Sequence, residues 1–207
     1  MYVNAHTELL VATRNAGKVR ELTELLAGVP LRLRGLDDFP GAPEVEETGA
    51  TFEENARIKA AGYSAHARLL TLADDSGLEV SALGGAPGVL SARYAGASAT
   101  DAERVELLLR ELSSADSDDR RARFVCIVAL HDPRSGATEL FRGVCPGRIA
   151  QKARGTNGFG YDPVFIPDGH SQTFAELPAH VKQQISHRAL ALRHARDFIR
   201  RAFGRLP

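Results

Sequence analysis

The chain has few cysteines, few aromatic residues and no net charge, and each of these shortages narrows the class of protein. Its two cysteines could form one disulfide at most, and buried thiols are the simpler interpretation. Aromatic residues make up 6% of the chain and hydrophobic residues 43%, which is typical of an ordinary globular protein. The 26 basic residues balance 26 acidic ones, so no positive field attracts a nucleic-acid polymer, and we expect a small ligand instead.

Long apolar runs are also missing. No stretch approaches the roughly 20 apolar residues that cross a bilayer, and the chain does not begin with a basic segment followed by an apolar one. We therefore expect a cytoplasmic protein with no membrane partner. Internal repeats and linkers are absent as well, and a length of 207 residues suits one compact unit, so residues 1–207 are predicted to form a single domain.

A strand, a loop and a helix are expected in this order near the beginning of the chain. Residues 8–13 form a short apolar run that is typical of a strand, and residues 15–27 have helical periodicity. A second helix is predicted from Thr51 to about Arg68, because the spacing Thr51-Phe-Glu-Glu54 is that of a capping box.

Two short strands are predicted next, on either side of an acidic turn. Residues 69–73 and 78–80 are apolar, and Asp74-Asp75-Ser76-Gly77 between them has the composition of a turn. A second capping box, Thr100-Asp-Ala-Glu103, predicts a helix over residues 104–112, and the polar residues 113–121 are expected to form a loop.

A hairpin and a long helix are expected in the C-terminal half. The β-rich residues 122–131 and 137–144 flank Asp132-Pro-Arg-Ser-Gly136, which has turn composition. The last helix is predicted to begin near Ser186, because apolar residues then recur at helical spacing: Ala189, Leu192, Ala195, Ile199 and Phe203. Strands mixed with helices predict an α/β fold with a mixed sheet and a cleft.

The first candidate for a functional site is the segment from Thr13 to Lys18. It lies where a strand is followed by a helix, so backbone N–H groups, the positive end of the helix dipole and the Lys18 charge favour an anion such as a triphosphate. The Gly-x4-Gly-Lys-Ser/Thr spacing of P-loop proteins is absent. The alternative is a tight turn with a solvated lysine.

The second candidate is acidic. Glu47 precedes the Thr51 helix, and Asp74 and Asp75 follow an apolar strand. Neighbouring carboxylates repel each other unless a cation lies between them, and a hard cation such as Mg²⁺ could also bridge the phosphate oxygens of a substrate. Alternatively, Asp74 caps a turn and Asp75 faces water, because these residue types are common in turns.

The third candidate combines a glycine-rich loop with a cationic segment. Glycines surround Phe159, whose ring could stack on a base, a contact worth ~1–3 kcal/mol, although a lone aromatic residue can equally belong to the core. Further along, Ser186 is suited to cap a helix. His187 and Arg188 would then lie in the first helical turn, where the dipole disfavours cations, so a compensating ligand or acid is expected.

Eight short motifs occur in order across nearly the whole chain: Thr13-x-Asn-x-Gly-Lys18, Glu47-Thr-Gly49, Phe52-x-x-Asn-Ala-x-x-Lys59, Ala73-Asp-Asp-Ser-Gly-Leu78, Gly84-Gly-Ala-Pro-Gly88, Ser91-Ala-Arg-Tyr94, Gly158-Phe-Gly-Tyr-Asp-Pro163 and Ser186-His-Arg188. Together these motifs resemble the inosine/xanthosine triphosphate pyrophosphatase family. Asn157 departs from the family pattern, in which glycine is expected at this position.

The resemblance implies a homodimer with an α/β fold, in which a mixed, twisted central sheet with flanking helices forms two lobes around a long substrate cleft. It also implies magnesium-dependent hydrolysis of deaminated purine nucleoside triphosphates, such as ITP, dITP and XTP, between the α and β phosphates. The products would be the nucleoside monophosphate and pyrophosphate.

The resemblance also assigns residues. The phosphates would be held by Thr13, Arg14, Asn15, Ala16, Gly17, Lys18 and Lys59, and the magnesium ion by Glu47 and Asp75. The base would be held by Phe159, Gly160, Tyr161, Asp162, Lys182, His187 and Arg188, and Ser76 is a further substrate contact. A carboxylate of the pair Asp74 and Asp75 would activate water, while Lys18 and Lys59 would stabilise the developing negative charge.

Two other functions are compatible with the same residues. One is a pyrophosphatase of related architecture that acts on modified pyrimidine or methylated nucleotides. The other is a nucleotide sensor that keeps the phosphate-binding segment and has lost catalysis. A phosphotransferase is disfavoured, because neither the P-loop spacing nor a kinase-type catalytic loop is present.

Overall fold

The computed structural model describes residues 7–204, which fall into two compact units. The first unit contains the chain up to Asp75, Cys126–Gly143 and the chain from Leu190 onward. The second unit contains Ser76–Val125 and Val144–Ala189. The single domain predicted for residues 1–207 stays a prediction.

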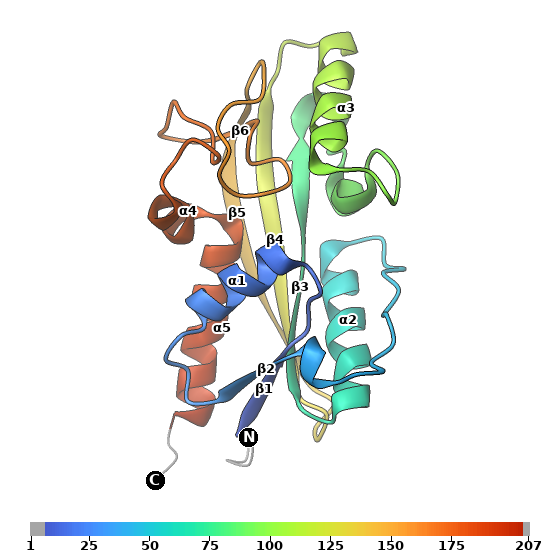
Figure 1. The fold of residues 1–207 in the computed structure, drawn as a ribbon, viewed down its shortest axis with the longest axis vertical. Coiled ribbons are helices and arrows are strands. Elements are labelled where there is room, and N and C mark those ends of the chain that lie inside the picture. The colour runs from blue at the N-terminus through green and yellow to red at the C-terminus, as the bar shows by residue number, and fades with distance from the viewer. Residues whose placement is uncertain (1–6, 205–207) are drawn as a thin grey trace. The chain divides into compact units, whose positions relative to one another are not determined.

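The strands form one mixed sheet, as predicted (Figure 1). In the described part of the chain the sheet has six strands in the order β2-β1-β3-β4-β5-β6. β1 pairs in parallel with both of its neighbours, β2 and β3, whereas β5 and β6 are antiparallel. The strands are β1 (Glu8–Val11), β2 (Arg32–Gly35), β3 (Leu70–Val80), β4 (Arg121–His131), β5 (Thr138–Ile149) and β6 (Phe165–Pro167).

In the first unit, helices cover both faces of the strands (Figure 1). α1 (Ala16–Leu25) and α5 (His187–Phe203) lie on one side, and α2 (Phe52–Ala67) lies on the other. The α5 stripe predicted from the sequence is buried in the core of this unit, where its members from Leu192 to Phe203 pack with Leu9 and Val11 of β1. Burying such a stripe is the main reason that an amphipathic helix is stable in a protein.

The second unit has its own apolar core. The described residues from 76 to 125 include α3 (Asp101–Ser114), and those from 144 to 189 include β6 and α4 (Ala179–Ile185). Leu108 of α3 packs with Phe165 of β6 and with neighbouring aromatic residues. The rings of Phe124 and Phe165 lie 4.6 Å apart, which is a favourable distance for two aromatic side chains.

Both predicted capping boxes are present. Thr51 begins α2 and Thr100 begins α3, and each hydroxyl accepts the N–H of a glutamate three residues later. The hairpin is also confirmed, since β4 and β5 are adjacent in the sheet and a turn at Asp132 joins them. α4 was not predicted. Among residues 7–204, no helix combines the length and apolar composition that crossing a membrane requires.

The predicted acidic turn is wrong. β3 continues from Leu70 through Asp74 and Asp75 to Val80, so the two carboxylates lie inside a strand. Their turn composition is overridden because β3 is an interior strand whose backbone pairs with its neighbours in the sheet. The alternative in which Asp75 faces water is excluded too, because Asp74 is 2% exposed and Asp75 is 5% exposed.

Candidate functional site

The segment from Thr13 to Lys18 lies between β1 and α1, as predicted. Asn15 caps α1, where its Oδ1 accepts the Lys18 N–H at 3.0 Å, and the Thr13 hydroxyl accepts the Asn15 N–H at 3.3 Å. The Arg14 guanidinium donates to the Ala42 carbonyl at 2.7 Å, which ties the segment to the loop before α2. The N-terminus of α1, with its positive dipole, is therefore held beside the end of β1.

Lys18 is not a solvated lysine. Its Nζ lies 2.9 Å from Asp74 Oδ2, and the Asp74 side chain is 1% exposed. This contact joins the predicted phosphate segment to the predicted acidic pair. The alternative of a tight turn with a free lysine is therefore wrong.

Lys59 of α2 joins two carboxylates that are far apart in the sequence. Its Nζ lies 3.0 Å from Glu47 Oε1 and 3.5 Å from Asp75 Oδ1. Consecutive side chains in a strand point to opposite faces, so Asp74 can reach Lys18 while Asp75 reaches Lys59. The first unit thus brings Lys18, Lys59, Glu47, Asp74 and Asp75 together, and we call this set the charged cluster.

The surroundings shift two pKa values in the charged cluster. Burial alone would lower the pKa of the Lys59 ammonium, but the attraction of Asp75, Asp74 and Glu47 outweighs it and raises that pKa. Burial raises the pKa of the Asp75 carboxyl; Glu47 and Asp74 act in the same direction, whereas Lys59 and Lys18 oppose them. Lys59 is therefore a persistent cation, and Asp75 is a stronger base than an exposed aspartate.

Asn55 holds the loop that carries Glu47, a role that the sequence did not indicate. The Asn55 side chain is fully buried, and its Oδ1 accepts the Gly49 N–H at 2.8 Å. A Cβ on Gly49 would lie 2.6 Å from the Cβ of Glu54, so only glycine fits this close approach. The position of Glu47 beside Lys59 thus depends on a glycine and a buried amide.

A second cluster lies entirely in the second unit, around the Phe159 ring. Asp162 Oδ2 accepts the Phe159 N–H at 2.9 Å and an N–H of the buried Lys182 ammonium at 2.5 Å. Lys182 Nζ is 4.6 Å from the centre of the Phe159 ring, and Arg188 Cζ is 5.6 Å from it. Phe159 is only partly buried, so the core alternative is wrong. Cations near a ring face are attracted by its π electrons.

His187 and Arg188 are buried at the beginning of α5. The His187 ring stacks on Phe124 with 4.6 Å between ring centres and 11° between planes. Arg188 donates to the Ser76 hydroxyl at 3.0 Å. Ser186 caps the helix as predicted, because its hydroxyl accepts the Ala189 N–H at 3.2 Å. We call Phe159, Asp162, Lys182, His187, Arg188 and Ser76 the ring cluster.

Tyr161 and Asn157 face other parts of the second unit. The Tyr161 side chain is 4% exposed, and its hydroxyl donates to the Ser91 carbonyl at 2.9 Å. The Asn157 amide donates to the Leu177 carbonyl at 3.3 Å, a contact that glycine could not make. Both side chains thus secure the loop around Phe159 and Gly160.

Comparison with known proteins adds to this geometry. The Ham1 family matches residues 9–198. The chain belongs to the Ham1 family. It is 51% identical, over 90% of its length and 93% of the relative, to a dITP/XTP pyrophosphatase of Exiguobacterium sibiricum.

Solved structures of this family agree with the fold. A HAM1 protein from Coxiella burnetii superimposes with a TM-score of 0.88 at 44% identity, covering 94% of this chain and 98% of that one. A nucleoside-triphosphatase / dITP/XTP pyrophosphatase from Mycobacterium abscessus has a TM-score of 0.74 at 46% identity, covering 91% and 98%. The mixed α/β architecture is therefore that of the Ham1 family.

Proposed function

We propose that this chain hydrolyses deaminated purine nucleoside triphosphates, such as ITP, dITP and XTP, to the monophosphate and pyrophosphate. The observation that carries the proposal is the charged cluster, in which Lys59 lies against Glu47 and Asp75 while Lys18 lies against Asp74. Relatives in the Ham1 family that bear the name dITP/XTP pyrophosphatase support the choice of substrate.

The charged cluster has the donors that a magnesium ion needs. Glu47 and Asp75 present hard carboxylate oxygens within 3.5 Å of the same ammonium nitrogen, so a cation is already favoured at this position. Mg²⁺ is usually held by one or two carboxylates together with water and substrate phosphates, and Glu47 and Asp75 supply two carboxylates.

In the proposed reaction, Asp75 accepts a proton from the water that attacks the α-phosphorus, and pyrophosphate leaves. The Asp75 carboxylate is suited to this role because it is buried within the charged cluster, where its oxygens can accept a proton from a bound water. Lys18 and Lys59 would stabilise the charge that grows on the bridging and β-phosphate oxygens. A bound Mg²⁺ would neutralise phosphate charge.

The ring cluster is proposed to select the base. Phe159 offers a partly exposed ring on which a purine can stack. Hypoxanthine and xanthine present an O6 acceptor to donors such as His187 and Arg188, whereas adenine presents an amino donor at the same position. A donor left without an acceptor loses a hydrogen bond, so adenine nucleotides would be discriminated against.

Product analysis tests the proposal directly. The purified chain is incubated with ITP and Mg²⁺, and the products are separated by chromatography. IMP with pyrophosphate is expected; IDP with phosphate, or no product, would contradict the proposal. A panel of triphosphates then tests the base, and faster hydrolysis of UTP or dTTP would favour a pyrimidine substrate.

Dependence on magnesium and assembly as a homodimer are also proposed, and both rest on the family resemblance. A cytoplasmic location is proposed as well. Sedimentation of the purified chain tests the dimer, and activity in the presence of a chelator tests the metal.

A further inference from the structure

The loop around Phe159 is tied to the beginning of α3, although the two segments are far apart in the sequence. Asp101, in the first turn of α3, accepts the Gly160 N–H on its Oδ2 at 2.6 Å. A hydrogen bond to a carboxylate is stronger than one between neutral groups. Gly160 directly follows Phe159, so this bond fixes the backbone next to the ring.

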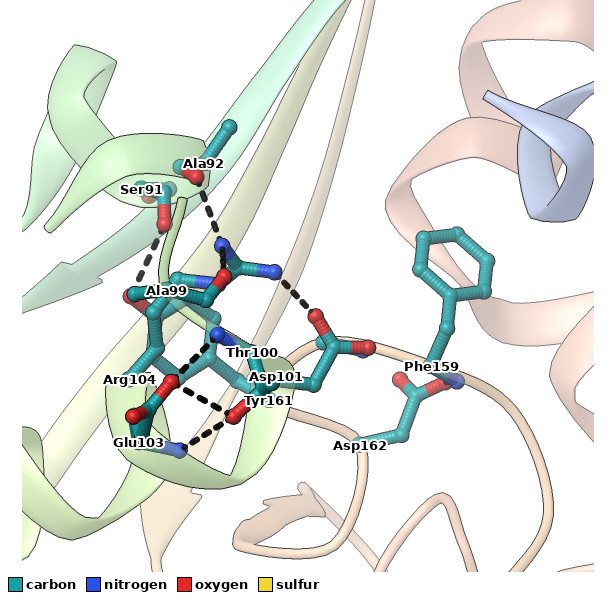
Figure 2. Close-up of polar contacts among 11 residues, drawn as sticks. Ser91, Ala92, Ala99, Thr100, Asp101, Glu103, Arg104, Phe159, Tyr161 and Asp162 are labelled. Atoms are coloured by element: carbon teal, nitrogen blue, oxygen red, sulfur yellow. Dashed lines mark hydrogen bonds and ion pairs between the residues drawn. The ribbon is translucent and has the colours of Figure 1, made fainter. Parts of the chain in front are cut away.

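Arg104 in turn orients Asp101. Its guanidinium contacts Asp101 Oδ1, donates to the Ala99 carbonyl at 2.6 Å and donates to the Ala92 carbonyl at 2.9 Å (Figure 2). The Arg104 side chain is 16% exposed, so it is largely shielded from water. The Asp101 carboxylate is therefore held in place by a group that is itself held by two backbone carbonyls.

The rest of the loop is held in the same unit. Tyr161 donates to the Ser91 carbonyl, and Asp162 accepts the Phe159 N–H (Figure 2). Gly158 and Gly160 have φ values of +78° and +61°, a region that few other residues adopt. A loop with such glycines has many conformations when free, so contacts from outside the loop are needed to select one.

We propose that Asp101 and Arg104 are positioning residues that hold the Phe159 loop, and that they thereby set the discrimination between bases. This inference rests on the proposed function of the ring cluster. Asp101 accepts the Gly160 N–H and Asp162 accepts the Phe159 N–H, so the backbone on both sides of the ring is held, with the ring near the cations of Lys182 and Arg188. A loop released on the α3 side would allow the ring to turn away and would admit other bases.

Glu103 provides a matched control, because it lies in the same helical turn. Its Oε2 accepts the Thr100 N–H at 2.7 Å and the Thr100 hydroxyl at 2.8 Å, which are contacts of the helix cap. Asp101→Asn and Glu103→Gln remove one negative charge each from the first turn of α3, without a large change in shape. A general effect on the helix or its dipole should therefore be similar in the two variants.

The first measurement is hydrogen–deuterium exchange at the Gly160 amide, which needs no substrate. The asparagine in Asp101→Asn has one acceptor oxygen, whereas the Arg104 guanidinium and the Gly160 N–H each need one. The Gly160 amide should therefore exchange roughly tenfold to a hundredfold faster than in the unaltered chain. Arg104→Lys keeps the charge but loses the planar fork, and it should raise exchange at the same amide. Glu103→Gln should leave this amide close to its original rate.

The second measurement is the ratio of kcat/KM for ITP to kcat/KM for ATP. We expect the ratio to fall by roughly tenfold in Asp101→Asn and to change little in Glu103→Gln. The loss should come mainly from a higher KM for ITP, because neither residue belongs to the charged cluster.

The possible outcomes separate the two proposals. The positioning role would be overturned if the Gly160 amide exchanged at the same rate in Asp101→Asn as in the unaltered chain. It would also be overturned if Asp101→Asn and Glu103→Gln changed this rate equally. An unchanged base ratio despite faster exchange would overturn the link to discrimination. General destabilisation would speed exchange at core amides such as Leu108 as well, and faster exchange without selectivity for Gly160 would also overturn the proposal. If the unaltered chain releases no pyrophosphate from ITP, the proposed function fails, whereas the exchange result stands.

Discussion

The charged cluster of the first unit and the ring cluster of the second unit are built by different means. In the charged cluster, Lys18 pairs with Asp74, and Lys59 pairs with both Glu47 and Asp75. In the ring cluster, a partly exposed aromatic ring lies near two cations, and Asp162 pairs with one of them, Lys182. The carboxylates of the charged cluster can bind either a lysine ammonium or a metal ion, and its lysines can stabilise negative charge that develops on phosphate oxygens. The ring cluster instead offers a flat ring surface with hydrogen-bond donors beside it. Changes in the first should affect kcat, and changes in the second should affect KM and the choice of base.

The largest effect is expected for Asp75→Asn. The amide cannot accept a proton from water, so kcat should fall by roughly 10²–10⁴-fold, the usual contribution of a general base. ITP should still bind, because the ring cluster and both lysines remain. Rapid-quench kinetics measure turnover, and equilibrium binding of ITP is the internal control. A near-normal rate would remove Asp75 from the mechanism.

Glu47→Gln tests the metal proposal, with Glu46→Gln as its matched control. Glu47 contacts Lys59, whereas the neighbouring Glu46 is exposed. The Mg²⁺ concentration for half-maximal activity should rise at least about tenfold in Glu47→Gln, because changes around a metal site commonly cost this much affinity. It should stay constant in Glu46→Gln. Equal magnesium dependence in both variants would exclude Glu47 as a ligand.

Phe159→Leu tests whether the two clusters have separate roles, with the ring cluster acting on substrate binding and the charged cluster on turnover. The substitution keeps an apolar side chain but removes the flat face, so KM for ITP should rise about tenfold, in line with the ~1–3 kcal/mol of base stacking. The value of kcat should change little. Steady-state kinetics with ITP give both constants, and a drop in kcat with constant KM would contradict the division.

The smallest effect is expected on the pH dependence of stability, which tests the surroundings of Asp75 in the charged cluster. Because the pKa of Asp75 is raised in the folded chain, folding favours its protonated form, and this contribution to stability is lost as pH rises through the folded-state pKa. Metal-free chain should therefore gain stability relative to Asp75→Asn as pH falls. Urea unfolding at several pH values, with a chelator present, measures the difference. If the unaltered chain instead gained stability relative to Asp75→Asn as pH rises, the attraction of Lys59 and Lys18 would outweigh the effect of burial on the Asp75 carboxyl.

Local signals in the sequence correctly placed several elements. Thr51 and Thr100 marked two helix starts, because a capping box involves only residues within one turn. The stripe from Ala189 to Phe203 marked α5, because the helical period is independent of what covers it. The mixed sheet followed from the order of these elements. Local chemistry indicated candidate site residues such as Lys18, Asp75 and Phe159, and the motif resemblance added others such as Lys59. The structure brings several of them together in the two clusters.

Only the tertiary structure decided how distant segments meet. Asp74 and Asp75 have turn composition, but they lie within a strand because pairing with other strands outweighs local preference. No local pattern shows that Asn55 supports the Glu47 loop. Asp101 belongs by sequence to a helix cap, yet its carboxylate reaches Gly160, 59 residues away. Such contacts depend on the folded path of the chain, which brings together groups that no short stretch of sequence can relate.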